Sequence, residues 1–502
     1  MDFIYNHLLS TIIFFPIIAA FFILFFFRSA RITMWLTFIA TIIECIFLIP
    51  LMSSFDKSVA TMQFVERYNW IESWGIQYYI GIDGISILMI FLTIILTAIS
   101  VLASFSYIKK KQREFYLSML LLESAMLGVF AALDFFLFYI FWEAMLIPMY
   151  LIIGVWGGEN RIYAAIKFFV YTLAGSLFML IAIIAIYLKY TDMFGEKTFD
   201  IIRLSSVVFP YNFQFYIFLA FLFAFAIKVP MFPLHTWLPD AHVEAPTAGS
   251  VILAGVLLKM GTYGFLRIAL PVAPLAALKF VPLIAILSVI AIVYGALMAL
   301  VQKDIKKLVA YSSVSHMGFV TLGIYALNKV GVEGGILQMF NHGIITGALF
   351  LLVGIIYERT HTRQIADYGG IAARVPVYAT MFMIFTFGSI GLPSMGAFVG
   401  EFLVLVGSFM AFSNYAIIAT TGIILSAFYM LWVYQRVFFH KFNEKLHDLT
   451  DMNIREWIYM IPLIVIVFWV GIYPETFTSY MHESVKLLLE QINNINVNIA
   501  MR

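Results

Sequence analysis

The sequence predicts an all-α, polytopic membrane protein with about fourteen transmembrane helices. Its 502 residues are 63% hydrophobic and only 12% charged, whereas soluble domains carry about 25% charged residues. Apolar runs of at least 18 residues recur along the whole chain, which is the length that a membrane-spanning helix needs. These runs do not alternate apolar and polar residues as the strands of a transmembrane barrel do, so we expect helices.

The expected spans are the apolar runs that lie between clusters of charged residues. One run, 376–408, is too long for a single straight span and is interrupted by Gly391, Leu392 and Pro393, so it predicts a broken helix. The fourteen predicted spans are 8–27, 32–52, 83–105, 115–132, 134–154, 164–188, 213–234, 247–269, 277–300, 307–326, 334–357, 376–408, 413–435 and 457–475.

Connections between the spans are short, so no separate soluble domain is expected. The longest connection, 53–82, is charged and predicts a small extramembrane lid. The tail 476–498 mixes apolar and polar residues at helical spacing, which suits a helix lying along the membrane surface or against a neighbour.

Lysine and arginine gather in alternate loops, and loops of this kind face the cytoplasm. The orientation predicted from them places both termini on the side of the membrane away from the cytoplasm. The net charge of +2 is too small to suggest binding to nucleic acid, and the single cysteine, Cys45, excludes a disulfide framework. The basic set comprises Arg28, Arg31, Lys109, Lys110, Lys111, Arg113, Arg161, Lys303, Lys306, Lys307, Arg359, Arg363, Arg374, Arg436, Lys441, Lys445 and Arg455.

Lys228 lies at the end of a long apolar run, directly before Pro230 and Pro233. A lysine at bilayer depth costs roughly 3 kcal/mol on insertion scales, so an ionisable residue there indicates function. The prolines predict a helix break, which frees backbone carbonyls that only protein or water can satisfy. Glu143, near the middle of the fifth span, is an acidic candidate partner. We favour a proton-exchanging pair over a static ion pair between two helices.

A second break is predicted at Pro393, with Glu401 eight residues further on. Two broken helices five spans apart suggest two five-helix repeats, and an odd number of spans inserts the second copy upside down. We predict N-terminal helices and a loop in 1–114 and a first inverted repeat in 115–234, whose last helix continues to about 270. A second repeat is expected in 271–436, and a last helix with an amphipathic tail in 437–502.

Three further ionisable residues could connect the two halves. Lys259 lies in the eighth predicted span and could pass a proton from Lys228 towards the second half. His316 and His342 follow in the tenth and eleventh spans, and histidine relays protons near neutral pH. A role as hydrogen-bonded packing residues is an equally good interpretation of both histidines. For Glu123, in the fourth span, packing or contact with a neighbouring protein is favoured.

The segment 233–244 resembles a metal site in composition, because it contains His235, Asp240, His242 and Glu244. Zinc sites usually place their ligands on one helix face or in short knuckles, whereas prolines interrupt this segment. Hydrogen bonding at the helix break is therefore the favoured interpretation, and no metal is expected. Because the sequence contains no glycine-rich phosphate loop, CxxC pair or haem motif, we expect no cofactor in this chain.

Long blocks of the sequence resemble the antiporter-like subunits of respiratory complex I. The longest, 228–261, begins KVPMFPLHTWLPDAHVEAP, and the blocks 141–143, 304–318 and 391–402 also fit. Sister chains of that family carry lysine at the position of Glu401, so the glutamate favours the chain M group, the counterpart of mitochondrial chain 4. The resemblance covers nearly the whole chain.

The resemblance implies fourteen helices, two inverted repeats and a role in proton translocation. It implies that Glu143 and Lys228 form a coupled pair and that Lys259 is the central relay. His316 and His342 would then be the link, and Glu401 the terminal residue. NADH, flavin, iron–sulfur clusters and quinone would be bound by partner subunits, and the neighbours would include other antiporter-like chains. Alternatives are a subunit of a multi-subunit sodium/proton antiporter, a membrane-bound hydrogenase subunit and, least favoured, a structural scaffold.

Overall fold

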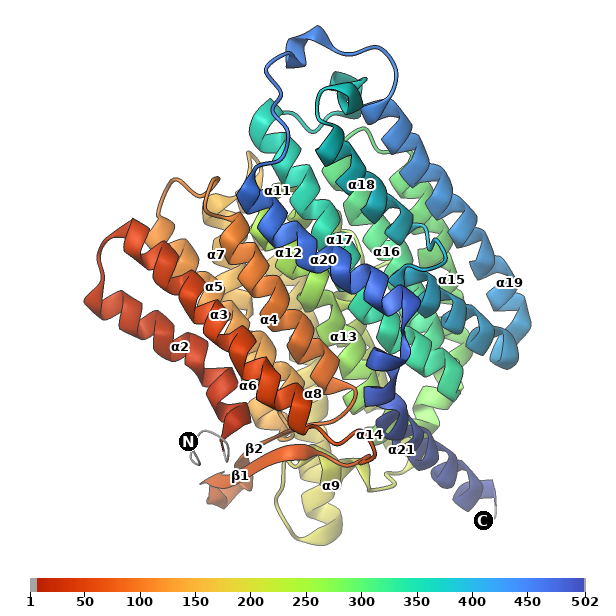
Figure 1. The fold of residues 1–502 in the computed structure, drawn as a ribbon. Coiled ribbons are helices and arrows are strands. Elements are labelled where there is room, and N and C mark those ends of the chain that lie inside the picture. Colours follow the sequence, from red (N-terminus) through yellow and green to blue (C-terminus); the bar gives the residue numbers. More distant parts are fainter. Residues whose placement is uncertain (1–6, 501–502) are drawn as a thin grey trace.

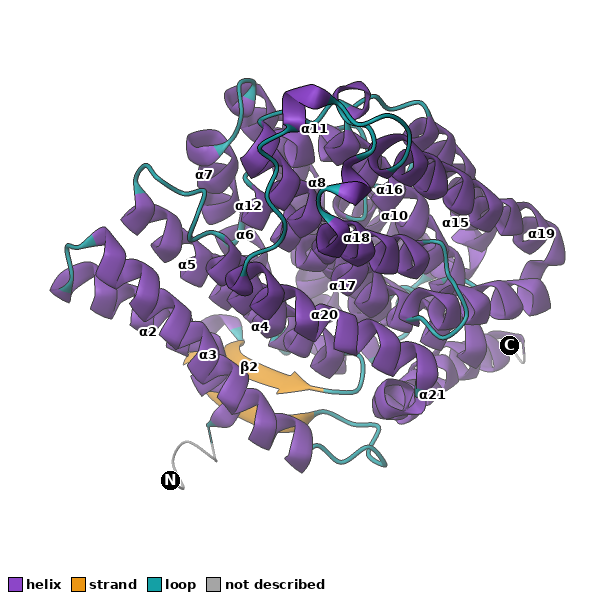
Figure 2. Ribbon diagram, turned by 45° about the horizontal axis from the view of Figure 1, so that its top comes forward, coloured by secondary structure: helices purple, strands orange, loops and turns teal. Residues whose placement is uncertain are grey.

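A computed structural model describes residues 7–500 as a bundle of long helices (Figure 1). The all-α, polytopic fold class is confirmed, and within the described residues the only named strands form one two-stranded sheet, drawn in orange in Figure 2. Twelve of the described helices are long and apolar enough to cross a membrane. They are α2 (Leu8–Phe26), α3 (Ala30–Ser54), α4 (Ser86–Ala103), α5 (Gln112–Ala131), α6 (Phe135–Ala144) continued by α7 (Leu146–Trp156), α8 (Arg161–Phe194), α10 (Tyr211–Lys228), α12 to α14 (Thr247–Val272), α15 (Pro274–Leu300), α17 (Lys329–Thr360), α19 (Gly396–Phe438) and α20 (Ile454–Ile472).

The count of twelve differs from the predicted fourteen at two places. Helix α16 (Ile305–Ile324) is a predicted span that is not among the twelve. Helix α19 runs through Phe412, whose backbone is not helical (φ −157°, ψ 79°), so one element covers parts of two predicted spans. The number fourteen, like the boundaries of the two repeats, therefore stays a prediction.

Both predicted helix breaks are present. Helix α10 ends at Lys228, and the chain turns through Pro230 and Pro233 before the short helix α11 (Trp237–Glu244). Helix α18 (Pro376–Ser389) is separated from α19 by a turn in which Gly391 has φ +73°. That left-handed conformation costs glycine little.

A third interruption was not expected. The predicted span 134–154 is divided at Met145, where α6 ends and α7 begins. Pro148 accounts for the break, because it has no N–H to donate to the carbonyl of Ala144, four residues earlier. The break directly follows Glu143.

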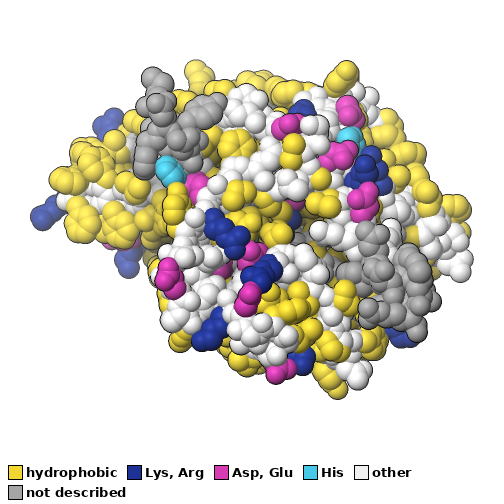
Figure 3. Space-filling model, turned by 90° about the horizontal axis from the view of Figure 1, so that it is seen from below, with side chains coloured by type: hydrophobic (Ala, Val, Ile, Leu, Met, Phe, Trp, Pro, Cys, Tyr) yellow, Lys and Arg dark blue, Asp and Glu magenta, His cyan; other side chains and the backbone are white. Residues whose placement is uncertain are grey.

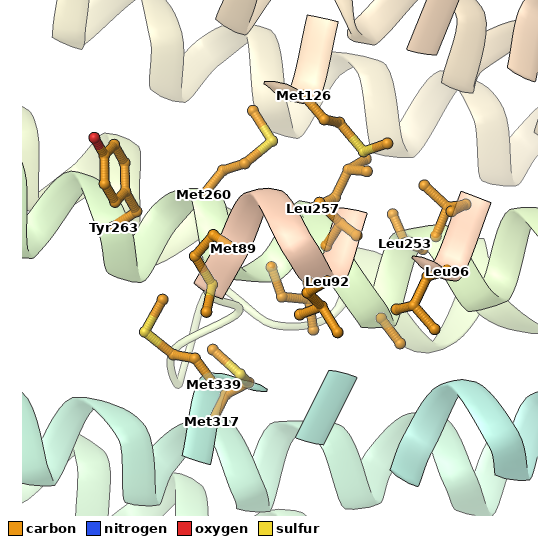
Figure 4. Packing of buried hydrophobic residues seen from close by; sticks show 14 of the residues in the cluster. Met89, Leu92, Leu96, Met126, Leu253, Leu257, Met260, Tyr263, Met317 and Met339 are labelled. Carbon is orange, nitrogen blue, oxygen red and sulfur yellow. The ribbon is translucent and has the colours of Figure 1, made fainter. Parts of the chain in front are cut away.

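Three helical segments form the centre of the bundle. An 18-residue stretch of each of the spans Thr247–Val272 and Lys329–Thr360 is fully buried, and 89% of the span Ser86–Ala103 is buried. Figure 4 shows Leu92 and Leu96 of α4 among side chains that include Leu253 and Leu257. The span Thr247–Val272 contains two stretches of wider π-helix, Leu253–Leu257 and Phe265–Ala269.

The predicted lid 53–82 contains an antiparallel hairpin of β1 (Gln63–Ile71) and β2 (Ile76–Ile82). It lies at the same end of the bundle as the start of α2 (Figure 1). In Figure 3, which views this end from below, charged side chains are scattered over the middle of the face and hydrophobic ones lie at its rim. The apolar rim is the surface that a bilayer or neighbouring membrane helices cover.

The tail forms one helix, α21 (Glu475–Ala500), which packs against its own bundle. Phe477 contacts Phe340 of α17 with ring centroids 5.2 Å apart. His482 Nδ1 lies 2.7 Å from Glu333 Oε1, also on α17. The start of α21 is therefore held on the central helix.

Candidate functional site

Four buried ionisable residues from four helices form a line that starts at Lys259 and runs into the second half of the molecule. Lys259 Nζ lies 2.6 Å from His342 Nδ1. The rings of His342 and His316 follow with centroids 5.8 Å apart. His316 Nδ1 then lies 2.8 Å from Glu401 Oε1. All four side chains are at most 4% exposed, so the structure brings together the four residues that the sequence placed between Lys228 and the far side.

The wide helical stretch before Lys259 explains how its amine is held. Lys259 is the second residue of α13 (Leu258–Gly264), a helix that directly follows the π-helical residues 253–257. A π stretch shifts the backbone hydrogen bonding by one residue, and Lys259 Nζ donates to the carbonyl of Ala254, five residues earlier. The amine therefore has one fixed backbone acceptor and one titratable partner, His342.

Glu401 is held by donors from two other helices. Its Oε1 accepts from Gln338 Nε2 at 2.9 Å and is 2.8 Å from His316 Nδ1. Since a carboxylate accepts hydrogen bonds only, His316 carries a proton on Nδ1 when Glu401 is ionised. His316 Nε2 then faces Ser389 Oγ at 3.3 Å, at the C-terminal end of α18 and beside the helix break.

Serines near His316 are bonded to the backbone. Ser312 and Ser313 each donate to the Val309 carbonyl, at 2.7 and 3.3 Å. Ser315 donates to the carbonyl of Ile292 on α15 at 2.8 Å. The bonds of Ser312 and Ser313 lie within α16, and only the bond of Ser315 links α16 to another helix; each hydroxyl oxygen can still accept a hydrogen bond.

Lys228 lies in different surroundings. It is the last residue of α10 and is 1% exposed. Its Nζ lies 3.3 Å from the sulfur of Met145 and 5.4 Å from the centre of the Trp142 ring. A thioether is a weak acceptor and an indole face attracts a cation, so the amine sits among polarisable groups without a strong hydrogen-bond partner.

Glu143 does not form an ion pair with Lys228 in the described residues, although the two interact electrostatically. One oxygen of Glu143 is buried without a hydrogen-bond partner, and Ser176 and Tyr139 are its polar neighbours. The residue is partly exposed at the outer side of α6. Met145, two residues further on, is the side chain that connects the Glu143 helix break to the amine of Lys228.

The two lysines lie on helices in close contact. A Cβ added to Gly261 on α13 would lie 3.0 Å from Lys228 Cβ and 2.7 Å from a methyl group of Val229. Only glycine therefore lets α13 approach the end of α10 so closely. Lys259, two residues before this glycine, is held in fixed relation to the first break.

The residues of the segment 233–244 have separate partners. Asp240 pairs with Lys167 at 2.7 Å, and Glu244 accepts from the N–H of Asn160 at 2.9 Å. His242 stacks on Phe350 with ring centroids 4.6 Å apart. His235 stacks with Phe232. Within residues 7–500, no group of three His, Cys, Asp or Glu side chains is arranged to hold a metal ion.

Sequence reasoning missed three residues that contact the site. Gln338 could have been found, because it lies one helical turn before His342 on α17 and so shares its face. Met145 was signalled only indirectly, by Pro148 three residues later. Ser389 left no signal, because nothing in the sequence places the end of α18 against α16.

The chain matches the profile of the family described as NADH:quinone oxidoreductase/Mrp antiporter, TM, over residues 132–428. It is 48% identical over 504 residues to NADH-quinone oxidoreductase subunit M of Rhodobacter capsulatus, covering 97% of each chain. It is 47% identical over 461 residues to NADH-ubiquinone oxidoreductase chain 4 of Marchantia polymorpha, covering 91% of each.

Solved structures agree with this assignment. A chain of respiratory complex I from Thermus thermophilus with bound NADH is similar with a TM-score of 0.88 and 31% identity, over 96% of this chain and 99% of that one. A chain of the Mrp complex from Dietzia sp. DQ12-45-1b has the same fold, with a TM-score of 0.85 at 19% identity, over 97% and 99% of the two chains. This multi-pass membrane protein therefore belongs to the NADH:quinone oxidoreductase/Mrp antiporter transmembrane family.

Proposed function

We propose that this chain is the proton-translocating membrane subunit of a NADH:quinone oxidoreductase, the counterpart of subunit M. Its family and its near full-length similarity to chains of that name support the assignment. The observation that carries the proton-translocating role is the buried line Lys259, His342, His316 and Glu401. Burying four ionisable side chains in a membrane protein is costly, and ionisable residues at this depth usually have a function.

The line can carry one proton by successive shifts. An ammonium at Lys259 gives its proton to His342 Nδ1, which lies 2.6 Å away. His342 releases the proton on its other nitrogen, Nε2, to His316, after the two rings approach or through a bridging water. His316 in turn releases its Nδ1 proton to Glu401 Oε1. Each histidine receives one proton before it gives one, so the line carries a single extra proton at a time.

Lys228 and Glu143 act in this proposal as the control element of the first half. Without a strong hydrogen-bond partner, the charge on Lys228 responds to small changes in its surroundings. We propose that Lys228 and Lys259 are coupled through the contact of α10 with α13 at Gly261, so that a change of charge on Lys228 shifts the proton of Lys259 towards His342.

We propose that the energy reaches this chain from partner subunits that carry NADH oxidation and quinone reduction, including neighbouring antiporter-like chains. Flavin and iron–sulfur clusters belong to those partners in this proposal. The membrane is proposed to be the bacterial inner membrane, with both termini on the periplasmic side, in accord with the asymmetry of basic loops.

The test is proton uptake by vesicles that contain the whole oxidoreductase, driven by NADH, with a His342→Leu variant. Leucine cannot exchange a proton, so uptake per NADH oxidised should fall by at least about tenfold. The matched control is His447→Gln, since His447 is an exposed histidine in the loop before α20. Normal uptake in the His342→Leu variant, at normal subunit content, would contradict a proton path through this line.

A cation/proton antiporter subunit of the Mrp type is the second candidate, because the family description and the shared fold include it. Sodium separates the two functions. For the proposed function, NADH-driven proton uptake proceeds in sodium-free medium, and added sodium does not release protons from acidified vesicles. Sodium-dependent proton release without NADH would favour the antiporter.

A further inference from the structure

Two buried glutamates in the N-terminal part of the chain lie outside the line from Lys259 to Glu401. Glu44 is on α3 and Glu123 on α5, and their side chains are 1% and 0% exposed. The two carboxyl groups lie within hydrogen-bonding reach of each other. None of their four oxygens receives a hydrogen bond from a donor group in the described residues.

Within the described residues, no cation balances these two acids. Apart from each other, the only ionisable group in that part of the chain that interacts electrostatically with either is Cys45, a thiol. Helices α2 and α4, which pack against α3 and α5, contain no acidic, basic or thiol side chain. The other such side chains on α3, α5 and the described helices packed against them are Arg31, Cys45, Arg113, Glu114, Glu143 and Lys259.

None of those cations is placed to pair with the glutamates. Arg31 is 13 residues before Glu44, which is about 20 Å along a helix, and Arg113 is about 15 Å before Glu123. Lys259 is bonded to His342. Thr97 lies beside Glu123, but its hydroxyl donates to the Thr93 carbonyl at 2.8 Å.

Two adjoining carboxylates without a donor or a cation repel each other and lack solvation, so a proton between them is the stable arrangement. One carboxyl then donates to the other, which supplies the missing donor. We propose that Glu44 and Glu123 are a proton-binding site that holds one shared proton, separate from the line that ends at Glu401.

Helix α3 also shows how a proton reaches this site. Thr33, Thr37 and Thr41 fall with Glu44 on one helix face, within about 80° of one another. All three threonines are 0% exposed, whereas the opposite face of α3 is apolar and exposed, for example at Ile39 and Ile46.

The hydroxyls of Thr33 and Thr37, and of Ser100 on the adjacent α4, have no hydrogen-bond partner in the described residues. Buried hydroxyls of this kind are usually satisfied by water. The threonine stripe begins next to Arg31 and runs towards the glutamates. It is therefore the route by which the shared proton exchanges with the basic end of the bundle.

Infrared spectroscopy of the whole oxidoreductase in membranes tests the site without relying on pumping. The wild type should show the carbonyl band of a buried protonated carboxyl that persists when the medium is made alkaline. Glu44→Gln and Glu123→Gln should each shift this band, because each replaces the hydrogen-bond partner of the remaining acid. The double variant should lose it. Glu114→Gln, at an exposed glutamate on the same helix as Glu123, should leave it unchanged.

Two outcomes would overturn the shared proton: no change of any protonated-carboxyl band in the double variant, or two independent bands that disappear one at a time without shifting. The single variants decide the matter if the double variant fails to assemble. The proton route is tested with Thr37→Val. This variant should slow the exchange of the shared proton for deuterium, followed as a shift of the carbonyl band, at least severalfold. An unchanged exchange rate would remove the threonine stripe from the proposal. The infrared result does not depend on the vesicle test with His342→Leu, so the shared proton and the proton-translocating role can fail separately.

Discussion

The two halves of the molecule each place an ionisable residue next to a helix break, but they surround it differently. In the first half, Lys228 ends α10 and contacts the sulfur of Met145 and the ring of Trp142. In the second half, Glu401 follows the break and is bonded to His316 and Gln338. A weakly held charge responds to its neighbours, whereas a charge held by fixed donors is oriented for transfer. Lys228 is therefore the residue whose charge responds to its surroundings, and Glu401 is the residue that fixed hydrogen bonds orient for proton transfer.

The largest effect is expected from Lys228→Ala, which removes the responsive charge. NADH-driven proton uptake should be nearly abolished, a loss of at least about a hundredfold, while the oxidoreductase still assembles. Proton uptake and subunit content should be measured on the same vesicles. The matched control is Lys279→Ala, since Lys279 is an exposed lysine on α15. Proton uptake close to normal in Lys228→Ala would show that the charge on Lys228 is not needed, which would contradict its role as the responsive residue of the first half.

Glu143→Gln should cause a loss of at least about tenfold in uptake, and combining it with Lys228→Ala should add little. The two side chains interact electrostatically without an ion pair, so Glu143→Asp should retain much of the activity. The measurement is a double-mutant cycle on uptake rates. Losses that multiply would show that the two residues work independently.

Changes at Glu401 address the connected half. Glu401→Gln keeps a group of nearly equal volume between His316 and Gln338 but cannot exchange a proton, so uptake should fall by about tenfold with assembly intact. Glu401→Lys keeps a titratable group, so we expect a smaller loss. Vesicles with equal content of the oxidoreductase should be compared. A harmless glutamine with a severely impaired lysine variant would instead indicate a static partner for a cation.

The smallest effect is expected from Gln338→Met, which removes one of the two donors to Glu401 Oε1. Because His316 still holds the same carboxylate oxygen of Glu401, uptake should fall only severalfold. Rescue by Gln338→Asn, whose shorter amide can still donate, should be partial. If Gln338→Met equalled Glu401→Gln in severity, the amide would be part of the transfer path itself.

Much of the site could be predicted because charged residues are rare within membrane-spanning apolar runs and are easily recognised there. Lys228, Lys259 and Glu401 stand out in apolar runs, and proline marks both predicted breaks. The order of residues along the line also followed from the order of the spans. The break at Met145 was missed because a single proline inside a long apolar run leaves the run looking continuous.

The sequence by itself determined the fold class, the two predicted helix breaks and the identities of the buried ionisable residues, because each depends on local composition and backbone chemistry. Contacts across helices were decided only by the tertiary structure. Lys259 directly follows a π-helical stretch, and its amine contacts both the Ala254 carbonyl and His342 of α17. Lys228 meets Met145 rather than Glu143, and Glu44 meets Glu123, because helix packing sets which faces touch. No spacing along the chain encodes those distances.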